Sequence, residues 1–540
     1  MTDLFSSLQK TLLKSDDNKT LTENGAVAYK SIGDKLVDLD ASVMSLRNAT
    51  AEEVMEKFHA VYSENPENAI IWMFMVGDIR EGKGERDTFN RCMDFLVKHN
   101  PKVVGSLLPL IPEYTRWDYA TRLMLSDDDY VSRKAEDLVV EQLREDIAAV
   151  EAGKNPSLLA KWLPSIQTKK AGQRRIVFKI EKQMGLDHKS YRKTISHLRD
   201  YLNIIEKSLS TKDISNINME ALTSHQNLKY GSVLQRIDPA ARKEYLEKVM
   251  TGEARMNAGV VYPYEILHRY CPYWYVNYYN IDLEALWKML PREGAGDTLV
   301  IRDGSGSMTQ RISEKSNATC LNVATAFAIY FSEQLQGPLH DKFITFSSSP
   351  EIVDMSHLAT LKEKIELCNR YDDYSNTDIK KTFDLLLETL VAGNAKPEEI
   401  PKNIMLLSDM EFDDCFAKEE ESAAERHCSC WNKSVFEHIR EEFKEHGYEL
   451  PRMIFWHINA NRVVQPLIDN ECGLVILSGF SPDTYNMVVK GEFDKEIVDV
   501  ETGEKKVVTM TPEEQMAKRL SAPRYDPVRK AIEPILKLLT

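Results

Sequence analysis

The stretch that most constrains this chain is residues 298–308, TLVIRDGSGSM. Leu299 to Ile301 are apolar, the chain turns polar at Asp303, and glycine and serine then alternate up to Ser307. The pattern predicts a buried strand that ends in a polar loop, and in open α/β sheets ligands bind at such strand ends. The glycines allow the backbone to turn tightly around whatever the carboxylate and the hydroxyls face.

Two later stretches add oxygen ligands. Thr377 immediately precedes a predicted helix, and the apolar run 404–407 predicts a second buried strand that leads to Asp409. Carboxylates and hydroxyls suit a hard divalent cation, Mg²⁺ first and Mn²⁺ or Ca²⁺ next. The alternative is a flexible Gly-Ser turn in which Asp409 only caps a helix. The predicted metal-site residues are Asp303, Ser305, Ser307, Thr377 and Asp409.

Length and composition bound the class of protein. A chain of 540 residues exceeds what one hydrophobic core normally supports, and 43% hydrophobic with 28% charged residues is typical of folded proteins. The formal net charge of -15 argues against a protein that binds polyanions over its whole surface. No apolar stretch reaches the length of a membrane span, and the start lacks the features of a signal peptide. We therefore expect a cytoplasmic protein with no membrane partner.

The two halves of the chain differ in their periodicity. Residues 1–47 form a polar tail, and residues 48–290 are helical nearly throughout, with short breaks that imply antiparallel neighbours in a HEAT-like arrangement without a fixed sequence period. Residues 291–540 alternate strands and helices, which predicts a parallel sheet covered on both faces. The expected fold class is α plus α/β, an α-helical repeat module followed by a doubly wound domain.

One basic segment stands out from the acidic chain. Between Lys161 and Lys212 there are thirteen Lys or Arg against four Asp or Glu. Such a local excess is typical of contact with a phosphate backbone, although a solvated face is the ordinary alternative. Tyr191 and His197 offer stacking surfaces within it. The candidate RNA-binding residues are Lys169, Lys170, Arg174, Arg175, Lys179, Lys189, Arg192 and Lys193.

A second metal hypothesis concerns four soft ligands, Cys415, His427, Cys428 and Cys430. Structural zinc sites normally show two separated ligand pairs, whereas this segment has a single Cys-x-Cys. Ordinary reduced thiols are the favoured interpretation.

Both halves carry a resemblance. D-x-S-x-S at Asp303, then Thr377, then Asp409 resembles the metal-ion-dependent adhesion site (MIDAS) of von Willebrand factor A domains. That resemblance implies direct metal ligation by the two serines and the threonine, and ligation through water by the two aspartates. Gly304 stands where that family usually has valine.

The helical half has its own motifs, DIREGKGER at 78–86, IPEYTRWD at 111–118 and KWLP at 161–164. They are similar to an uncharacterised family that pairs a TROVE-like helical module with an A-like domain, distantly similar to the Ro autoantigen. This resemblance implies binding of small structured or noncoding RNA by the helical half.

The leading hypothesis is an RNA-binding scaffold, not an enzyme, whose metal site accepts a carboxylate from a protein partner. One alternative is a metal-dependent protein-assembly module without RNA binding. Another is a metal-dependent phosphoester hydrolase, which is less favoured because no histidine stands near the predicted carboxylates as a general base.

Overall fold

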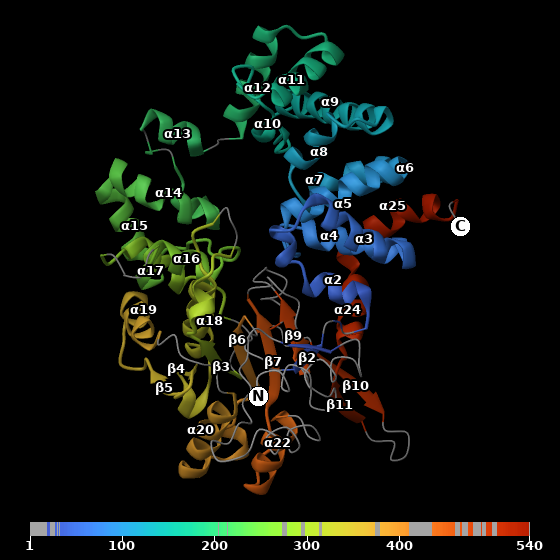
Figure 1. Ribbon diagram of the computed structural model, residues 1–540. Helices are drawn as coiled ribbons and strands as arrows, with labels where there is room; N and C mark the ends of the chain where they lie inside the picture. The colour runs from blue at the N-terminus through green and yellow to red at the C-terminus, as the bar shows by residue number, and fades with distance from the viewer. Residues whose placement is uncertain are drawn as a thin grey trace. The chain divides into compact units, whose positions relative to one another are not determined.

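The computed structural model describes residues 19–21, 27–29, 31, 33–202, 205–212, 214–215, 217–272, 278–292, 297–312, 316–372, 379–409, 435–458, 465–466, 474–478, 488, 493–498 and 505–538. Its contacts group the chain into two units (Figure 1). The sheet unit comprises residues 1–48, 222–229 and 248–517, and the helical unit comprises residues 49–221, 230–247 and 518–540. This grouping differs from the expected division at residue 290, because segments distant in sequence pack together.

The helical unit consists of short helices joined by brief connections. Its helices are α3 Ala51–Glu64, α4 Pro66–Gly77, α5 Arg86–His99, α6 Pro101–Leu107, α7 Ile111–Tyr114, α8 Trp117–Leu123, α9 Asp129–Glu151, α10 Leu159–Trp162, α11 Ala171–Met184, α12 His188–Tyr201, α13 Ile205–Thr211 and α25 Asp526–Leu536. Two further helices, α14 Ser224–Ile237 and α15 Pro239–Thr251, run across the unit boundaries. The predicted helical character of this half is confirmed.

Local sequence explains where these helices begin. At the start of α3 the Thr50 hydroxyl accepts a hydrogen bond from the backbone N–H of Glu53. The Glu53 carboxylate in turn accepts one from the backbone N–H of Thr50. The next helix begins directly afterwards at Pro66, where the missing N–H of proline costs nothing. Val54, Phe58 and Val61 form the buried stripe of α3, as their spacing predicts.

The C-terminal helix α25 belongs to this unit and packs on α4 and α6. Just before it, the Arg524 guanidinium makes two hydrogen bonds to the fully buried Asp78 carboxylate, at 2.8 and 3.1 Å. Asp78 opens the glycine-rich loop at 78–86. That carboxylate therefore holds the segment before α25 against the loop that follows α4.

The sheet unit is built on six strands in the order β5-β4-β3-β6-β7-β9. All neighbours are parallel except β4 and β5. The strands are β3 Thr298–Asp303, β4 Lys342–Phe346, β5 Ile352–Asp354, β6 Asn403–Ser408, β7 Arg452–His457 and β9 Leu474–Ser478. Numbered along the chain, this is the order 3-2-1-4-5-6 of a doubly wound sheet, so α plus α/β is confirmed at this level.

Helices cover both faces of the sheet, as Figure 1 shows for α18 and α20. The surrounding helices are α16 Pro263–Tyr270, α17 Ile281–Lys288, α18 Cys320–Ser332, α19 Leu361–Cys368, α20 Ile379–Ala392 and α22 Val435–Glu445. Leu299 and Ile301 share one core with apolar side chains of α20 and α22. Because side chains alternate along a strand, Arg302 points to the opposite face, where it contacts α18.

The segment expected to be a polar tail, residues 1–47, contains regular structure. β1 Lys19–Leu21 and β2 Val27–Tyr29 pair with each other, and β2 pairs with β8 Gln465–Pro466. Helix α2 Lys35–Ala41 follows, with the Asp34 side chain accepting two backbone N–H bonds at its start. Near the other end, β10 Asp494–Val498 pairs with β11 Lys505–Thr509, and α24 Pro512–Leu520 follows.

Candidate metal site and basic helical surface

Four of the five predicted metal-site residues, Asp303, Ser305, Ser307 and Asp409, lie at the switch point of the sheet. Strands β3 and β6 are neighbours, and the chain winds away from them in opposite directions, β3 toward β4 and β6 toward β7. Asp303 ends β3, and Ser408-Asp409 ends β6. In open α/β sheets this is where ligands bind, because the loops on either side part there.

Asp303 is the fixed centre of the group. It is 1% exposed, its Oδ1 accepts the backbone N–H of Ser305 at 2.8 Å, and its Oδ2 accepts the hydroxyl of Ser408 at 2.6 Å. These bonds fix the carboxylate at the strand end. Burial, and then the negative charge of Asp409, raise the pKa of Asp303 to about 7.

The two serine hydroxyls converge beside it. Ser305 Oγ and Ser307 Oγ are 3.0 Å apart, and both residues are partly exposed in the loop that continues into a short 3₁₀ helix, η4 Gly306–Thr309. The structure therefore brings Asp303, Ser305 and Ser307 together, with buried Asp409 close enough to influence the Asp303 carboxyl. The donor set consists of oxygen atoms with two carboxylates, which fits a hard divalent cation.

Gly304 has a local explanation. A Cβ at this position would lie 3.0 Å from the carbonyl oxygen of Tyr371, closer than nearly all real Cβ contacts. The end of η6 (Asn369–Tyr371) thus passes against the end of β3, and a valine at position 304 would require one of the two to shift.

Thr377 lies outside the described residues, and so do Cys415, His427, Cys428 and Cys430 of the zinc hypothesis. Within the described ranges no group of three or more His, Cys, Asp or Glu is arranged to hold a metal ion. Four cysteines are described, Cys92, Cys271, Cys320 and Cys368, and these four are buried and form no disulfide.

Sequence reasoning missed Arg302, which is fully buried on the far face of β3. Its Nη1 donates to Thr325 Oγ1 at 2.9 Å, and its Nη2 lies 2.8 Å from Asp372 Oδ1 and 3.2 Å from the Tyr371 carbonyl oxygen. The guanidinium therefore ties β3 to the end of η6 and to Asp372. An arginine inside an otherwise apolar strand was the available signal.

His457 was also missed. It is buried, ends β7 and stands in register with Ser408 of β6. Ser408 in turn bonds Asp303, so His457 lies in the same row of the sheet, two strands from Asp303. Two inter-strand steps amount to about 9.6 Å. His457 is only one strand from Asp409, which directly follows Ser408.

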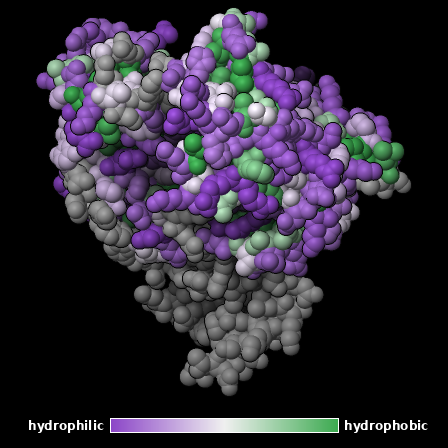
Figure 2. Space-filling model, turned by 90° about the horizontal axis from the view of Figure 1, so that it is seen from above, coloured by the Kyte–Doolittle hydropathy of each residue, from purple (hydrophilic) through white to green (hydrophobic). Residues whose placement is uncertain are grey.

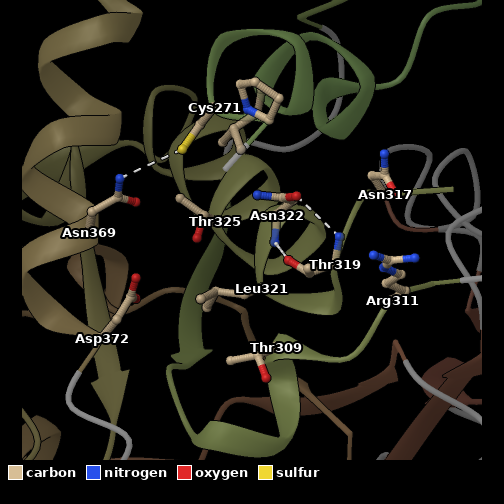
Figure 3. A pocket seen from close by; sticks show the side chains of 12 residues that line it. Cys271, Thr309, Arg311, Asn317, Thr319, Leu321, Asn322, Thr325, Asn369 and Asp372 are labelled. Atoms are coloured by element: carbon tan, nitrogen blue, oxygen red, sulfur yellow. Dashed lines mark hydrogen bonds between the residues drawn. The ribbon is translucent and has the colours of Figure 1, made fainter. Parts of the chain in front are cut away.

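A pocket of about 560 Å³ lies beside η4, the short helix that follows Ser305 (Figure 3). Thr309 of η4 lines it, and so do Asp372, the partner of Arg302, and Asn322 from the first turn of α18. Asn369 and Arg311 extend the lining. Amides, hydroxyls, one carboxylate and one cation thus line the cavity together with apolar residues such as Leu267 and Leu321.

The basic segment folds into α11 and α12 of the helical unit, where most of its cations face solvent. On α11 and α12 and just before α11, the exposed cations are Lys169, Lys170, Arg174, Arg175, Lys182, Lys189, Arg192 and Lys193. No ion pair joins any of these eight side chains to another residue in the described part of the chain. The structure thus leaves seven of the eight predicted RNA-binding side chains available to a ligand and adds Lys182.

Lys179 and Tyr191 differ from the sequence-based expectation. Lys179 is partly buried, and its ammonium is 3.1 Å from Glu136 Oε2 and 2.9 Å from Ser132 Oγ. Tyr191 is 1% exposed and donates its hydroxyl to the Pro164 carbonyl. The prediction that Tyr191 offers a stacking surface is wrong, because helical spacing directs its ring into the core. His197 is exposed.

Comparisons with known proteins find similarity to two domain families and to one curated protein. Residues 297–532 match the model of a domain of unknown function, DUF7788, and residues 22–114 and 178–290 match that of another, DUF2828. Among curated proteins, the chain is 26% identical over 516 residues to the uncharacterized protein L728 of Acanthamoeba polyphaga mimivirus, covering 88% of this chain and 85% of that protein.

Among solved structures, the chain is similar to the Ro (RSR) protein of Deinococcus radiodurans. The identity is 12% and the TM-score 0.35, over 83% of this chain and 93% of the other. A likeness of this size carries no argument about function. In the described ranges no helix combines the length and apolarity of a membrane span.

Proposed function

We propose that this protein is an RNA-binding scaffold that also carries a divalent-metal-dependent binding site. The observation that carries the RNA proposal is the set of eight exposed cations on and just before α11 and on α12, without ion-pair partners among the described residues. Cations in a folded protein are commonly paired or scattered, and a local excess of unpaired cations over carboxylates is the electrostatic footprint of phosphate binding. The net charge of -15 makes this group a local exception.

The metal proposal rests on the chemistry of the donors at the switch point. Asp303 and Asp409 are two buried carboxylates beside two convergent hydroxyls, and a cation there would offset the cost of burying like charges together. We propose a von Willebrand A-type site in which Ser305, Ser307 and Thr377 bind Mg²⁺, or Mn²⁺ or Ca²⁺, directly. Asp303 and Asp409 would hold its water ligands. The metal would supply a position for a partner oxygen.

The partner that fits this site is a protein with an exposed carboxylate. Such a group would complete the coordination of a hard cation. The pocket beside the metal loop, with Asn322, Asn369 and Arg311 in its lining, offers hydrogen bonds to the residues next to that carboxylate. The helical unit would then hold RNA, in a HEAT-like arrangement, while the sheet unit holds a protein. We propose binding and not hydrolysis, because aspartates that hold a metal through water are more typical of binding sites.

The test of RNA binding is a salt titration on the full-length protein with total small RNA. We expect log K to fall linearly with log[salt], by about 0.7 per phosphate contact for single strands. Changing Lys169, Lys170, Arg174 and Arg175 to Glu should abolish binding. The matched control changes four other exposed lysines of the helical unit to Glu: Lys57, Lys98, Lys102 and Lys134.

Both variants change the net charge by the same amount. A difference between their RNA affinities would therefore come from the position of the charges and not from their number. Equal loss in both would mean that total charge, and not the α11–α12 surface, governs binding. Absence of wild-type binding at low salt would remove the RNA proposal and leave a metal-dependent protein-assembly module.

A further inference from the structure

The exposed face of α11 carries a phenylalanine, Phe178, among its cations. Phe178 is 63% exposed, and it is the one phenylalanine among the large hydrophobic residues that are exposed in the described part of the chain. On a helix, residues three and four apart are neighbours, so Arg174, Arg175 and Lys182 surround its ring. The face is therefore an aromatic ring framed by three cations.

This face also lacks negative charge. The single acidic residue of α11, Glu181, is buried, and its carboxylate lies 2.6 Å from Nδ1 of His188 at the start of α12. Lys179, the remaining cation in the second half of the helix, is engaged with Glu136. Nothing on α11 itself thus neutralises the cations around Phe178.

Exposure alone would not make Phe178 a binding residue. Figure 2 shows hydrophobic residues in small groups among hydrophilic ones, and single exposed hydrophobic residues are ordinary. The combination of groups is what discriminates between ligands. Lysine is depleted from the cores of protein interfaces but arginine is enriched there, so among the three cations only Lys182 argues against a protein contact. Sites for unpaired nucleic acid combine cations for the backbone with aromatic rings on which bases stack.

We infer that Phe178 is a base-stacking contact of the RNA surface, with Arg174, Arg175 and Lys182 on the flanking phosphates, and that the α11 face takes unpaired nucleotides. This inference rests on the proposed RNA function and deepens it. Bases inside a duplex have both faces covered by their neighbours, so only an unpaired base can stack on the ring. The arginines beside Phe178 can also stack their planar guanidinium groups on a base.

The test is fluorescence anisotropy with a labelled oligoadenylate, single-stranded or annealed to oligouridylate. The full-length protein is compared with Phe178→Ala, Phe178→Leu and Phe178→Trp. We expect Ala and Leu to weaken single-strand binding by roughly 5- to 100-fold, the range that loss of one base stack produces. Trp should bind at least as tightly as the wild type. Duplex binding should be weaker and insensitive to all three changes.

A matched control is Leu158→Ala, which removes another exposed apolar side chain of the helical unit, 54% exposed, and should leave affinity unchanged. The salt slope should be the same for Phe178→Ala and the wild type, because phenylalanine releases no counterions. Phe178 is exposed, so these variants should fold, which circular dichroism checks.

The outcomes separate the two proposals. Wild-type affinity in both Phe178→Ala and Phe178→Leu, with binding lost in the four-site Glu variant, would overturn stacking and leave the RNA surface intact. Full affinity in Leu alone would also overturn stacking, since apolar area would then be sufficient. Loss of binding to anionic vesicles in Phe178→Ala, without any effect on RNA, would assign the ring to a membrane surface. Failure of the wild type to bind either RNA would remove the proposed function itself.

Discussion

The metal-site edge of the sheet and the basic face of α11 and α12 are opposite kinds of candidate site. At the edge, Asp303 is buried and both of its carboxylate oxygens accept hydrogen bonds, so the site depends on geometry. On the helices, Arg174 and Arg175 are exposed and make no ion pair with a described residue, so the surface depends on the number of charges. A change at the edge should therefore affect stability and shape, whereas a change on the helices should affect affinity alone.

The largest expected effect is that of Arg302→Met at the edge. Its guanidinium is 0% exposed and pairs with the Asp372 carboxylate at 2.8 Å, so its removal leaves a largely buried charge without its partner. We expect a loss of about 3–5 kcal/mol in the free energy of unfolding, measured by urea denaturation. The double variant Arg302→Met with Asp372→Asn should recover part of it, because the amide carries no charge.

The control for this prediction is Lys402→Met, which removes an ion pair to Asp297 whose side chains are 80% and 51% exposed. Its cost should be about 0–1 kcal/mol. An Arg302→Met protein as stable as this control would show that the buried pair does not support the edge.

The second prediction concerns stabilisation by Mg²⁺, which should depend on Asp303 and not on the helical surface. Asp303→Asn keeps the shape of the side chain and can still accept the Ser305 N–H, but it removes one of two neighbouring carboxylates. In the wild type, Mg²⁺ at about 100 times its dissociation constant should add ~2.7 kcal/mol of stability, seen as a rise in the melting temperature that EDTA reverses. In the variant this rise should vanish.

RNA affinity should be the same in Asp303→Asn and in the wild type, because the proposed RNA contacts are cations of α11 and α12 and do not include Asp303. A parallel loss of RNA affinity would contradict the two-site proposal. Wild-type stabilisation by Mg²⁺ in the variant would remove Asp303 from the metal site.

The sequence predicted the edge better than it predicted the helical surface. The apolar run 299–301 and the polar loop after it identify a strand end, because burial and alternation are local properties of a chain. The alternation of strand and helix predicted a parallel sheet covered on both faces, whereas the order of its strands became known only from the structure. The buried Arg302 could not be interpreted in this way, since its partner Asp372 lies seventy residues further along and only the fold brings them together.

The helical surface shows where periodicity is insufficient. A count of charges found the segment, yet Lys179 and Arg175 look alike in the sequence. The fold separates them, because α9 provides Glu136 against Lys179 and nothing described against Arg175. Tyr191 and Phe178 likewise differ in exposure, because the first is buried and the second is exposed. Tyr191 lies on the packed face of α12 and Phe178 on the open face of α11, and only three-dimensional packing decides which aromatic ring remains exposed.

The smallest expected effect sharpens the comparison within the helical surface itself. Arg175→Gln and Lys179→Gln each remove one charge from α11, but only Arg175 is free to neutralise a phosphate. Arg175→Gln should reduce the magnitude of the salt slope by about 0.7 and leave the melting temperature unchanged. Lys179→Gln should leave the slope unchanged and cost about 0–1 kcal/mol of stability, because its partly buried bond to Glu136 is lost. Equal slopes in both variants would mean that RNA senses the overall charge of α11 and not the particular side chains that the packing of α9 leaves exposed.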